Sequence, residues 1–261
     1  MSKILGLKIL SLTVLMASPL IAQSQAATDG LPALQRQIDD LKESQRAIQS
    51  QLDEIKRLLL GTPGAQAPEL SNVTISLNGH PSKGSREAKL ILVDFSDYQC
   101  PFCGRFFAES LPHIERDFIA TGKLRYVFRD FPLEMIHSEA FKAHEAAGCA
   151  GDQEKYWEMH DRLFQNQQQM QPDDLARHAA AIGINPGIFQ SCLSSRKHAA
   201  TIRKNMDEGK RAGVQGTPTL FLGVQNDENR DMKVFDVIRG AQPYLQVKKM
   251  IERALQAQVK W

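Results

Sequence analysis

Apolar residues recur along residues 31–60 at alternating spacings of three and four, the pattern of a coiled-coil helix. Charged residues fill the positions between them, so a lone helix would expose an apolar stripe. Gly, Ala and Pro then dominate residues 61–70, which is typical of a linker. The stripe either packs on the chain's own globular part or pairs with copies of itself. The linker favours self-association, and the mixture of Leu and Ile along the stripe favours a trimer, with Gln45 as one polar layer.

Residues 71–261 alternate between strand-like and helical patterns. Short apolar runs predict strands at 73–77, 89–95 and 124–128, and helical signals run over 100–119 between the last two. Strand, helix and strand joined by a short return predict a parallel βαβ unit. Helical periodicity over about 136–211 predicts an insertion of several short helices. A hairpin (216–222 and 234–238) and an amphipathic helix (243–258) close an α/β domain.

The first 26 residues differ in character from the rest. Lys3 and Lys8 precede a short apolar run, and small residues end at Ala26, which predicts a cleaved secretory signal peptide. An uncleaved anchor is the alternative, but the apolar run is short for a membrane span. Cleavage removes two of 32 basic residues and none of 30 acidic ones, leaving no net charge. A neutral chain gives no indication of a nucleic-acid partner, and we expect the mature protein in the periplasm.

Two cysteines, Cys100 and Cys103, follow the buried strand at C-x-x-C spacing. If Cys100 begins the helix, unpaired backbone N–H groups and the helix dipole lower its pKa and make its thiolate a nucleophile. Pro101 suits a first helical turn, and Cys103 would be the resolving thiol. The same spacing could be half of a zinc site, but no second pair of ligands follows at usable spacing.

The two remaining cysteines, Cys149 and Cys192, both lie in the predicted helical insertion. In an exported protein they most simply form a structural disulfide. A second redox pair and two buried free thiols are the alternatives. The seven histidines are scattered without convincing metal spacing, so we assign no metal site.

Taken together, these motifs resemble the thioredoxin fold in its DsbA-type form. The resemblance covers about residues 70–258 and rests on Val93-Asp94-Phe95, Cys100-Pro101-Phe102-Cys103 and Gly216-Thr217-Pro218-Thr219. With its coiled-coil prefix, the chain is also similar to oligomeric periplasmic disulfide isomerases of the ScsC type.

The resemblance implies roles for individual residues. Cys100 matches the exposed nucleophile, and Cys103 matches its buried partner. Pro218 matches a cis-proline beside the sulfurs, leaving the Thr217 backbone to pair with an extended substrate. Pro101 and Phe102, between the cysteines, complete the expected substrate-binding residues. The positions matched by Pro101 and Phe102 hold Pro-His in the strongest oxidants of the family, so how oxidising this protein is stays open.

Asp94 matches a buried acid that shuttles the proton of Cys103; a solvated strand-end carboxylate is the alternative.

The expected function is disulfide formation or shuffling in unfolded or misoxidised exported client proteins. The electrons stay on sulfur, so no cofactor is expected, and a membrane redox partner would reset the site. Two other functions remain open: a Cu(I)-binding protein that uses the same thiolates, and an oligomeric holdase. Oxidase, isomerase and reductase activity are not distinguished.

Overall fold

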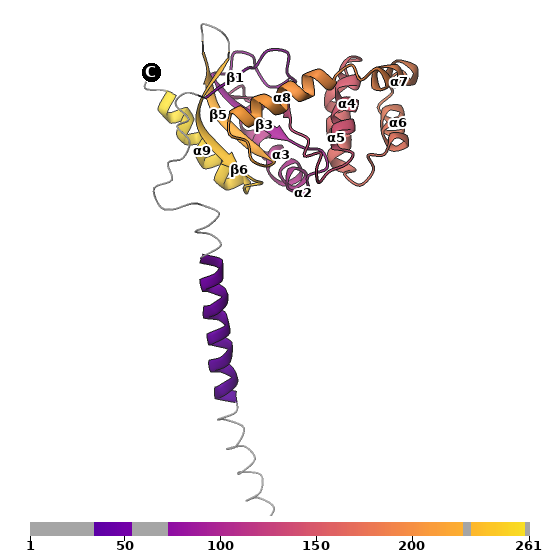
Figure 1. Cartoon of the computed structure of the whole chain (residues 1–261). Coiled ribbons are helices and arrows are strands. Elements are labelled where there is room, and N and C mark those ends of the chain that lie inside the picture. Colours follow the sequence, from indigo (N-terminus) through magenta and orange to yellow (C-terminus); the bar gives the residue numbers. More distant parts are fainter. Residues whose placement is uncertain (1–33, 54–72, 227–230, 259–261) are drawn as a thin grey trace, which may run out of the picture. The chain divides into compact units, whose positions relative to one another are not determined.

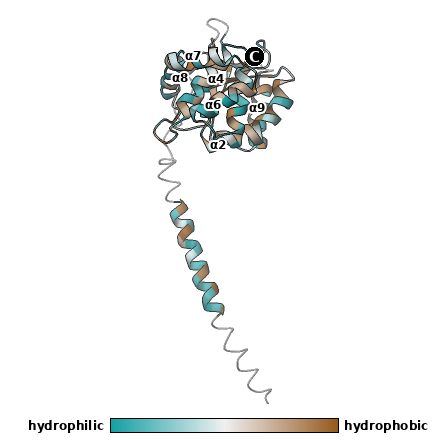
Figure 2. Ribbon diagram, turned by 90° about the vertical axis from the view of Figure 1, so that its right-hand side faces the viewer, coloured by the Kyte–Doolittle hydropathy of each residue, from teal (hydrophilic) through white to brown (hydrophobic). Residues whose placement is uncertain are grey.

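The chain divides into two units, Met1–Gln66 and Ala67–Trp261, and the computed structural model describes residues 34–53, 73–226 and 231–258. In the first unit, residues 34–53 form one helix, inside the predicted 31–60. Its apolar residues are exposed, from 40% for Ile38 to 72% for Leu41. Figure 2 shows them as hydrophobic positions recurring among hydrophilic ones. The predicted signal peptide (1–26) and linker (61–70) lie outside the described residues, and self-association of the helix stays a prediction.

The second unit is built on a six-stranded sheet with the order β1-β6-β5-β3-β4-β2. β3 and β4 run parallel, with Leu90 opposite Leu124, which confirms the predicted βαβ unit. All other neighbours are antiparallel. β2 was not predicted, because two polar residues carry no strand pattern. The strands are β1 (Thr74–Ile75), β2 (Ser82–Lys83), β3 (Leu90–Ser96), β4 (Leu124–Asp130), β5 (Thr219–Gln225) and β6 (Met232–Arg239).

The helix between β3 and β4 is continuous but contains two π-helical segments: α2 (Pro101–Arg105), η2 (Phe106–Ser110), α3 (Leu111–Ile114) and η3 (Glu115–Ile119). Between β4 and β5 lies the predicted insertion. Figure 1 shows its first four helices grouped to one side of the sheet. The insertion consists of α4 (Ala140–Gly151), α5 (Tyr156–Gln165), α6 (Pro172–Ala181), α7 (Pro186–Ser195) and α8 (Ala199–Arg211). The final helix is α9 (Tyr244–Gln258).

Both faces of the central strand β3 are covered. Leu90 and Leu92 belong to a core that includes Val247 and Ile251 of α9, and this core continues into the insertion. Ile91, Val93 and Phe95 belong to a second core on the opposite face, with Ile202 and Met206 of α8. Every residue of β3 is buried. The end of this strand is therefore held firmly in the core, and it positions residues 97–100, which follow it. No helix in the described part of the chain combines the length and apolar character needed to cross a membrane.

Candidate active site

The turn between β3 and α2 holds Cys100 at the N-cap of the helix. Its backbone is extended (φ −69°, ψ 120°), and Pro101 follows at the first helical position, where a missing N–H costs nothing. The Cys100 N–H donates to Asp97 O (3.1 Å), and the Gly104 N–H donates to Cys100 O (3.0 Å). Cys103 therefore lies one helical turn further on, and both sulfurs share the start of the helix.

Asp97 fixes this turn, and sequence reasoning missed it. The side chain is fully buried and accepts a hydrogen bond from the Gln99 N–H (2.8 Å). Its second oxygen accepts one from the Leu133 N–H (2.7 Å) and lies 2.8 Å from Nδ1 of His137. An aspartate that bonds to the backbone two residues on is typical of an Asx turn, the one signal the sequence offered. The loop that follows β4 is thereby tied to the active-site turn.

The prediction that Cys100 is exposed is wrong. Cys100 and Cys103 are both free thiols, and they are only 3% and 1% exposed. Cys100 is covered because the Thr217–Pro218 segment lies against it, with Cys100 Sγ 3.4 Å from Thr217 O.

The two cysteines have opposite electrostatic environments. Hydrogen bonding from the Cys103 thiol lowers the pKa of Cys100 from 9.0 to about 6, against the opposing effect of burial. The Thr217 side chain and the Cys103 and Phe102 backbone amides add to this lowering. Burial raises the pKa of Cys103 well above its ordinary value, because no water solvates a thiolate there. At neutral pH the pair therefore holds one thiolate, on Cys100, and one thiol.

Thr217 and Pro218 are joined by a cis peptide bond, as the resemblance implied. β5 begins at Thr219, later than the predicted start at 216, and Thr219 pairs with Phe95 near the end of β3. This register brings Pro218 beside the turn that carries Cys100. Pro218 is buried. Pro101 and Phe102 are exposed, Phe102 to 54%, and lie on the outer side of the same turn.

Asp94 is buried beneath the cysteines, 2% exposed, and does not end the strand in solvent. Burial raises its pKa from 3.8 to about 7, because the charged form loses its hydration. The Tyr126 hydroxyl donates to Asp94 Oδ2 (2.7 Å), and Asp94 Oδ1 has no partner among the described residues. A charge on Asp94 in turn raises the Cys103 pKa, so the two groups compete for one proton. Tyr126 lies on β4 and was not predicted.

Gln167, in the loop after α5, binds the active-site turn from the insertion side. Its Nε2 donates to Tyr98 O (2.8 Å) and to Cys100 O (2.9 Å). Gly104 makes room for this side chain, because a Cβ there would lie 2.1 Å from Gln167 Oε1. Residues 166–169 around it form a loop, and the sequence gave no sign of this contact.

Cys149 on α4 and Cys192 on α7 form a disulfide, with their Cα atoms 5.8 Å apart. It joins two helices of the insertion. One group of potential metal ligands occurs among the described residues: both these sulfurs and His198, with ligand atoms within 4.8 Å of one another. Because the sulfurs are bonded to each other, neither offers a thiolate, so the group does not form a metal site in this state.

Comparison with known proteins gives the family. A sequence model of the family described as thioredoxin matches residues 76–239, which is more than half of the chain. The chain belongs to the thioredoxin family. The fold of this thioredoxin-family chain resembles the crystal structure of oxidised BdbD from Bacillus subtilis, with a TM-score of 0.60 and 26% identity over 70% of this chain and 96% of that one. The predicted thioredoxin fold with a helical insertion is confirmed.

This thioredoxin-family chain covers most of one curated relative and only a small part of another. Disulfide bond formation protein D of Bacillus subtilis is 27% identical over 69% of this chain and 79% of its own length. A Na(+)/H(+) antiporter, NhaA 3 of Salinispora tropica, is 35% identical over 54% of this chain, but the chain spans only 21% of that protein. The antiporter therefore matches through a minor part of its length.

Proposed function

We propose that this protein is an exported thiol:disulfide oxidoreductase that forms or shuffles disulfide bonds in client proteins. The observation that carries the proposal is the asymmetry of the cysteine pair. Cys100 has a pKa of about 6 at a helix N-terminus, and Cys103 is buried with a raised pKa. A thiolate attacks disulfides whereas a thiol does not, so one sulfur begins the exchange and the other completes it.

Each step of the exchange balances. In the reduced protein, the Cys100 thiolate attacks a client disulfide, forms a mixed disulfide and releases one client thiolate. Cys103 then loses its proton and attacks the Cys100 sulfur, which closes the Cys100–Cys103 disulfide and releases the second client thiolate. In the reverse direction, a client thiolate attacks the closed disulfide at Cys100. No group other than sulfur gains or loses electrons.

Asp94 is the proposed acceptor of the Cys103 proton. Its pKa of about 7 allows it to be both protonated and ionised near neutral pH, as a general base requires. Tyr126 holds one carboxylate oxygen, and the other oxygen is free to bind a proton. This role is a proposal, as are the substrate-contacting roles of Thr217, Pro218, Pro101 and Phe102.

Apolar side chains beside the active-site turn support unfolded proteins as clients. Phe102 is 54% exposed, and Met135 and Ile136 are 99% and 72% exposed. The loop that carries Met135 and Ile136 is bound to the turn, because the Leu133 and Glu139 N–H groups donate to Asp97 and Gln99. Folded proteins bury such residues, so this surface favours clients that still expose apolar segments.

The wider setting is also part of the proposal. Residues 1–26 direct export to the periplasm and are removed, and a membrane redox partner resets the cysteines. Copies of the chain associate through residues 31–60, with a trimer preferred, which would place several sites around one client. The exposed apolar stripe of residues 34–53 supports this association, because such a stripe is unfavourable in water.

Recovery of a scrambled, disulfide-containing substrate protein tests the function. We expect Cys100→Ser to abolish recovery, because the attacking thiolate is gone. Cys103→Ser is the matched variant: it retains attack but cannot resolve, so mixed disulfides with clients accumulate and are visible on non-reducing gels. Recovery by Cys100→Ser at the unmodified rate would refute the proposal. The reduction potential of the pair then distinguishes oxidase from isomerase, with values near about −120 and −180 mV typical of the two kinds.

A further inference from the structure

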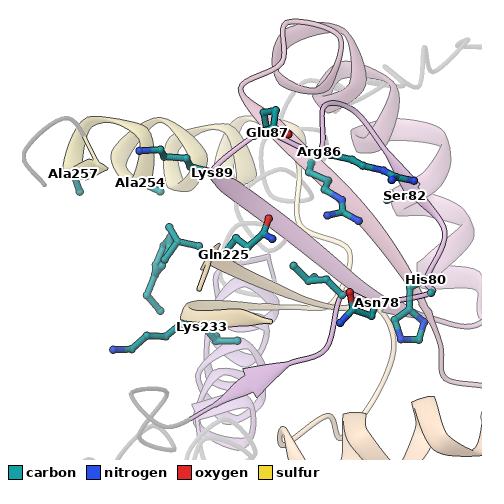
Figure 3. A pocket seen from close by; sticks show the side chains of 17 residues that line it. Asn78, His80, Ser82, Arg86, Glu87, Lys89, Gln225, Lys233, Ala254 and Ala257 are labelled. Atoms are coloured by element: carbon teal, nitrogen blue, oxygen red, sulfur yellow. The ribbon is translucent and has the colours of Figure 1, made fainter. Parts of the chain in front are cut away.

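A cavity of about 1160 Å³ lies at the end of the sheet opposite the cysteines (Figure 3). Residues just before β3, at the end of β5 and on α9 line it, including Lys89, Gln225 and Ala254. Cys100 follows the other end of β3, and seven strand residues span about 23 Å. The proposed thiol chemistry uses none of the residues that line this cavity.

The charge of the cavity is strongly one-sided. Arg86, Lys89, Arg125 and Lys233 line it, and Glu87 is the one acid among the described lining residues. None of the four cations forms an ion pair with any residue that the structure describes. By contrast, Lys83 is paired with Glu115 (2.5 Å), and the fully buried Arg129 is paired with Glu208 (2.5 Å). Unpaired cations that share one cavity repel one another unless an anion lies between them.

Arg125 is the least satisfied of these cations. It lies on β4, is half-buried, and its Nε is enclosed without a hydrogen-bond partner. Burial and, secondly, the nearby charge of Arg86 lower its pKa. An enclosed guanidinium N–H without an acceptor is unfavourable, and a planar fork of donors matches a phosphate or carboxylate group.

The cations are spread along the cavity, and two of them lie close together. Arg125 and Arg86 are close enough to influence each other's charge. In Figure 3, Lys89 and Lys233 lie on either side of Gln225 with their amino groups directed apart, and Arg86 lies nearer to Asn78 and His80. Because β3 and β5 lie between β4 and β6, the backbones of Arg125 and Lys233 are about 14 Å apart across the sheet. One small ion does not reach all four cations.

We propose that this cavity binds a small polyanion, a compound with several phosphate or carboxylate groups, at a site separate from the cysteine pair. One anionic group would lie between Arg86 and Arg125, and the others would extend along the cavity toward Lys89 and Lys233. Gln225 would hydrogen-bond the part between these groups, and Asn78 and Ser82 would add hydrogen bonds at the Arg86 end. Burial lowers the His80 pKa to about 4, so this lining residue is neutral and adds no fifth charge at neutral pH. This inference is independent of the proposed redox function.

Calorimetric titration of the full chain with inorganic tripolyphosphate, at fixed ionic strength, tests the site. We expect one equivalent to bind per chain, and Arg125→Gln to weaken binding about tenfold or more, since a hydrogen bond to a charged group is removed. Lys249→Gln is the matched control: it removes an exposed cation of α9 that does not line the cavity, and it should leave affinity unchanged. Monophosphate should bind more weakly than tripolyphosphate, because it reaches Arg86 and Arg125 only.

A second pair of variants keeps the test decisive if Arg125→Gln fails to fold. Lys89→Gln and Lys233→Gln change exposed side chains and should each weaken tripolyphosphate binding while thiol exchange continues at its normal rate. Citrate in place of tripolyphosphate identifies whether carboxylate or phosphate is preferred, and tight binding of either supports the site. Absence of binding, or equal weakening by Lys249→Gln, would overturn the proposal.

Discussion

Cys103 is predicted to control the ionisation of Cys100. The Cys103 thiol is the largest stabiliser of the Cys100 thiolate, and the Cys100 pKa lies about three units below its ordinary value of 9.0. Three units correspond to about 4 kcal/mol. A hydrogen bond to a charged group contributes about 1.5–3 kcal/mol, so Cys103→Ala should raise the Cys100 pKa by about one to two units. Cys103→Ser keeps an O–H donor at the same place and should shift it less.

The measurement is the thiolate absorbance of the reduced protein in the ultraviolet, followed against pH. Only the Cys100–Cys103 pair contributes in the reduced state of this site, because Cys149 and Cys192 are bonded to each other. We expect an apparent pKa of about 6 for the unmodified protein and of about 7–8 for Cys103→Ala. The reasoning is refuted if the unmodified protein titrates near 9, or if Cys103→Ala and Cys103→Ser titrate alike.

Reaction rates give a second, pH-dependent check. At pH 7 a pKa of about 6 makes about 90% thiolate, but the intrinsic nucleophilicity of a thiolate falls with its pKa, which offsets most of the gain. Alkylation of Cys100 at pH 7 should therefore differ little between Cys103→Ala and the unmodified protein. At pH 5 the variant has roughly ten- to a hundredfold less thiolate and should react about threefold or more slowly.

Three further predictions concern the rest of the chain. The folded-state pKa of Asp94 is raised from 3.8 to about 7, so its ionisation costs stability as pH rises from about 4 to 7. In the oxidised protein, the free energy of unfolding of Asp94→Asn should rise by up to about 4 kcal/mol relative to the unmodified chain between pH 4 and pH 7. Urea unfolding at several pH values measures this difference. If the unfolding free energies of the two proteins changed equally with pH, the burial of Asp94 would be contradicted. Replacing Cys149 and Cys192 by Ser should cost about 4 kcal/mol on the chain-entropy model for a separation of 43 residues, with thiol exchange retained; an unchanged urea midpoint would argue against this role. Leu41→Asp should reduce the solution mass to that of a monomer, Ser50→Asp should not, and an unchanged mass would exclude association through this stripe.

The parts of the fold that sequence predicted are those encoded locally. Continuous apolar residues identified β3, and the proline after Cys100 identified the start of α2, because both signals lie within a few residues of the element they specify. The cis bond before Pro218 followed from a resemblance to a family. Asp94 as a buried acid followed in the same way, and its raised pKa fits that expectation.

The contacts that sequence did not predict join residues far apart in the chain. Asp97 binds the backbone of Leu133, 36 residues away, and Gln167 binds the carbonyl of Cys100, 67 residues away. Asp97 and Gln167 both lie in polar loops, where Asp and Gln are common. A local sequence pattern does not indicate a contact with a residue so far away in the chain. The burial of Cys100 was missed for the same reason, since its cover comes from Thr217, 117 residues further along.

The amide of Gln167 has a consequence for rebuilding this scaffold. One side chain of the loop after α5 binds the carbonyls of Tyr98 and Cys100, and it fits there because residue 104 is a glycine. Replacing the helical insertion by one of another length would displace Gln167 and with it the backbone of Cys100, even if every transplanted helix folded well. Chimeras of this protein should therefore keep residues 165–169 with the recipient sheet, whatever helices are placed around them.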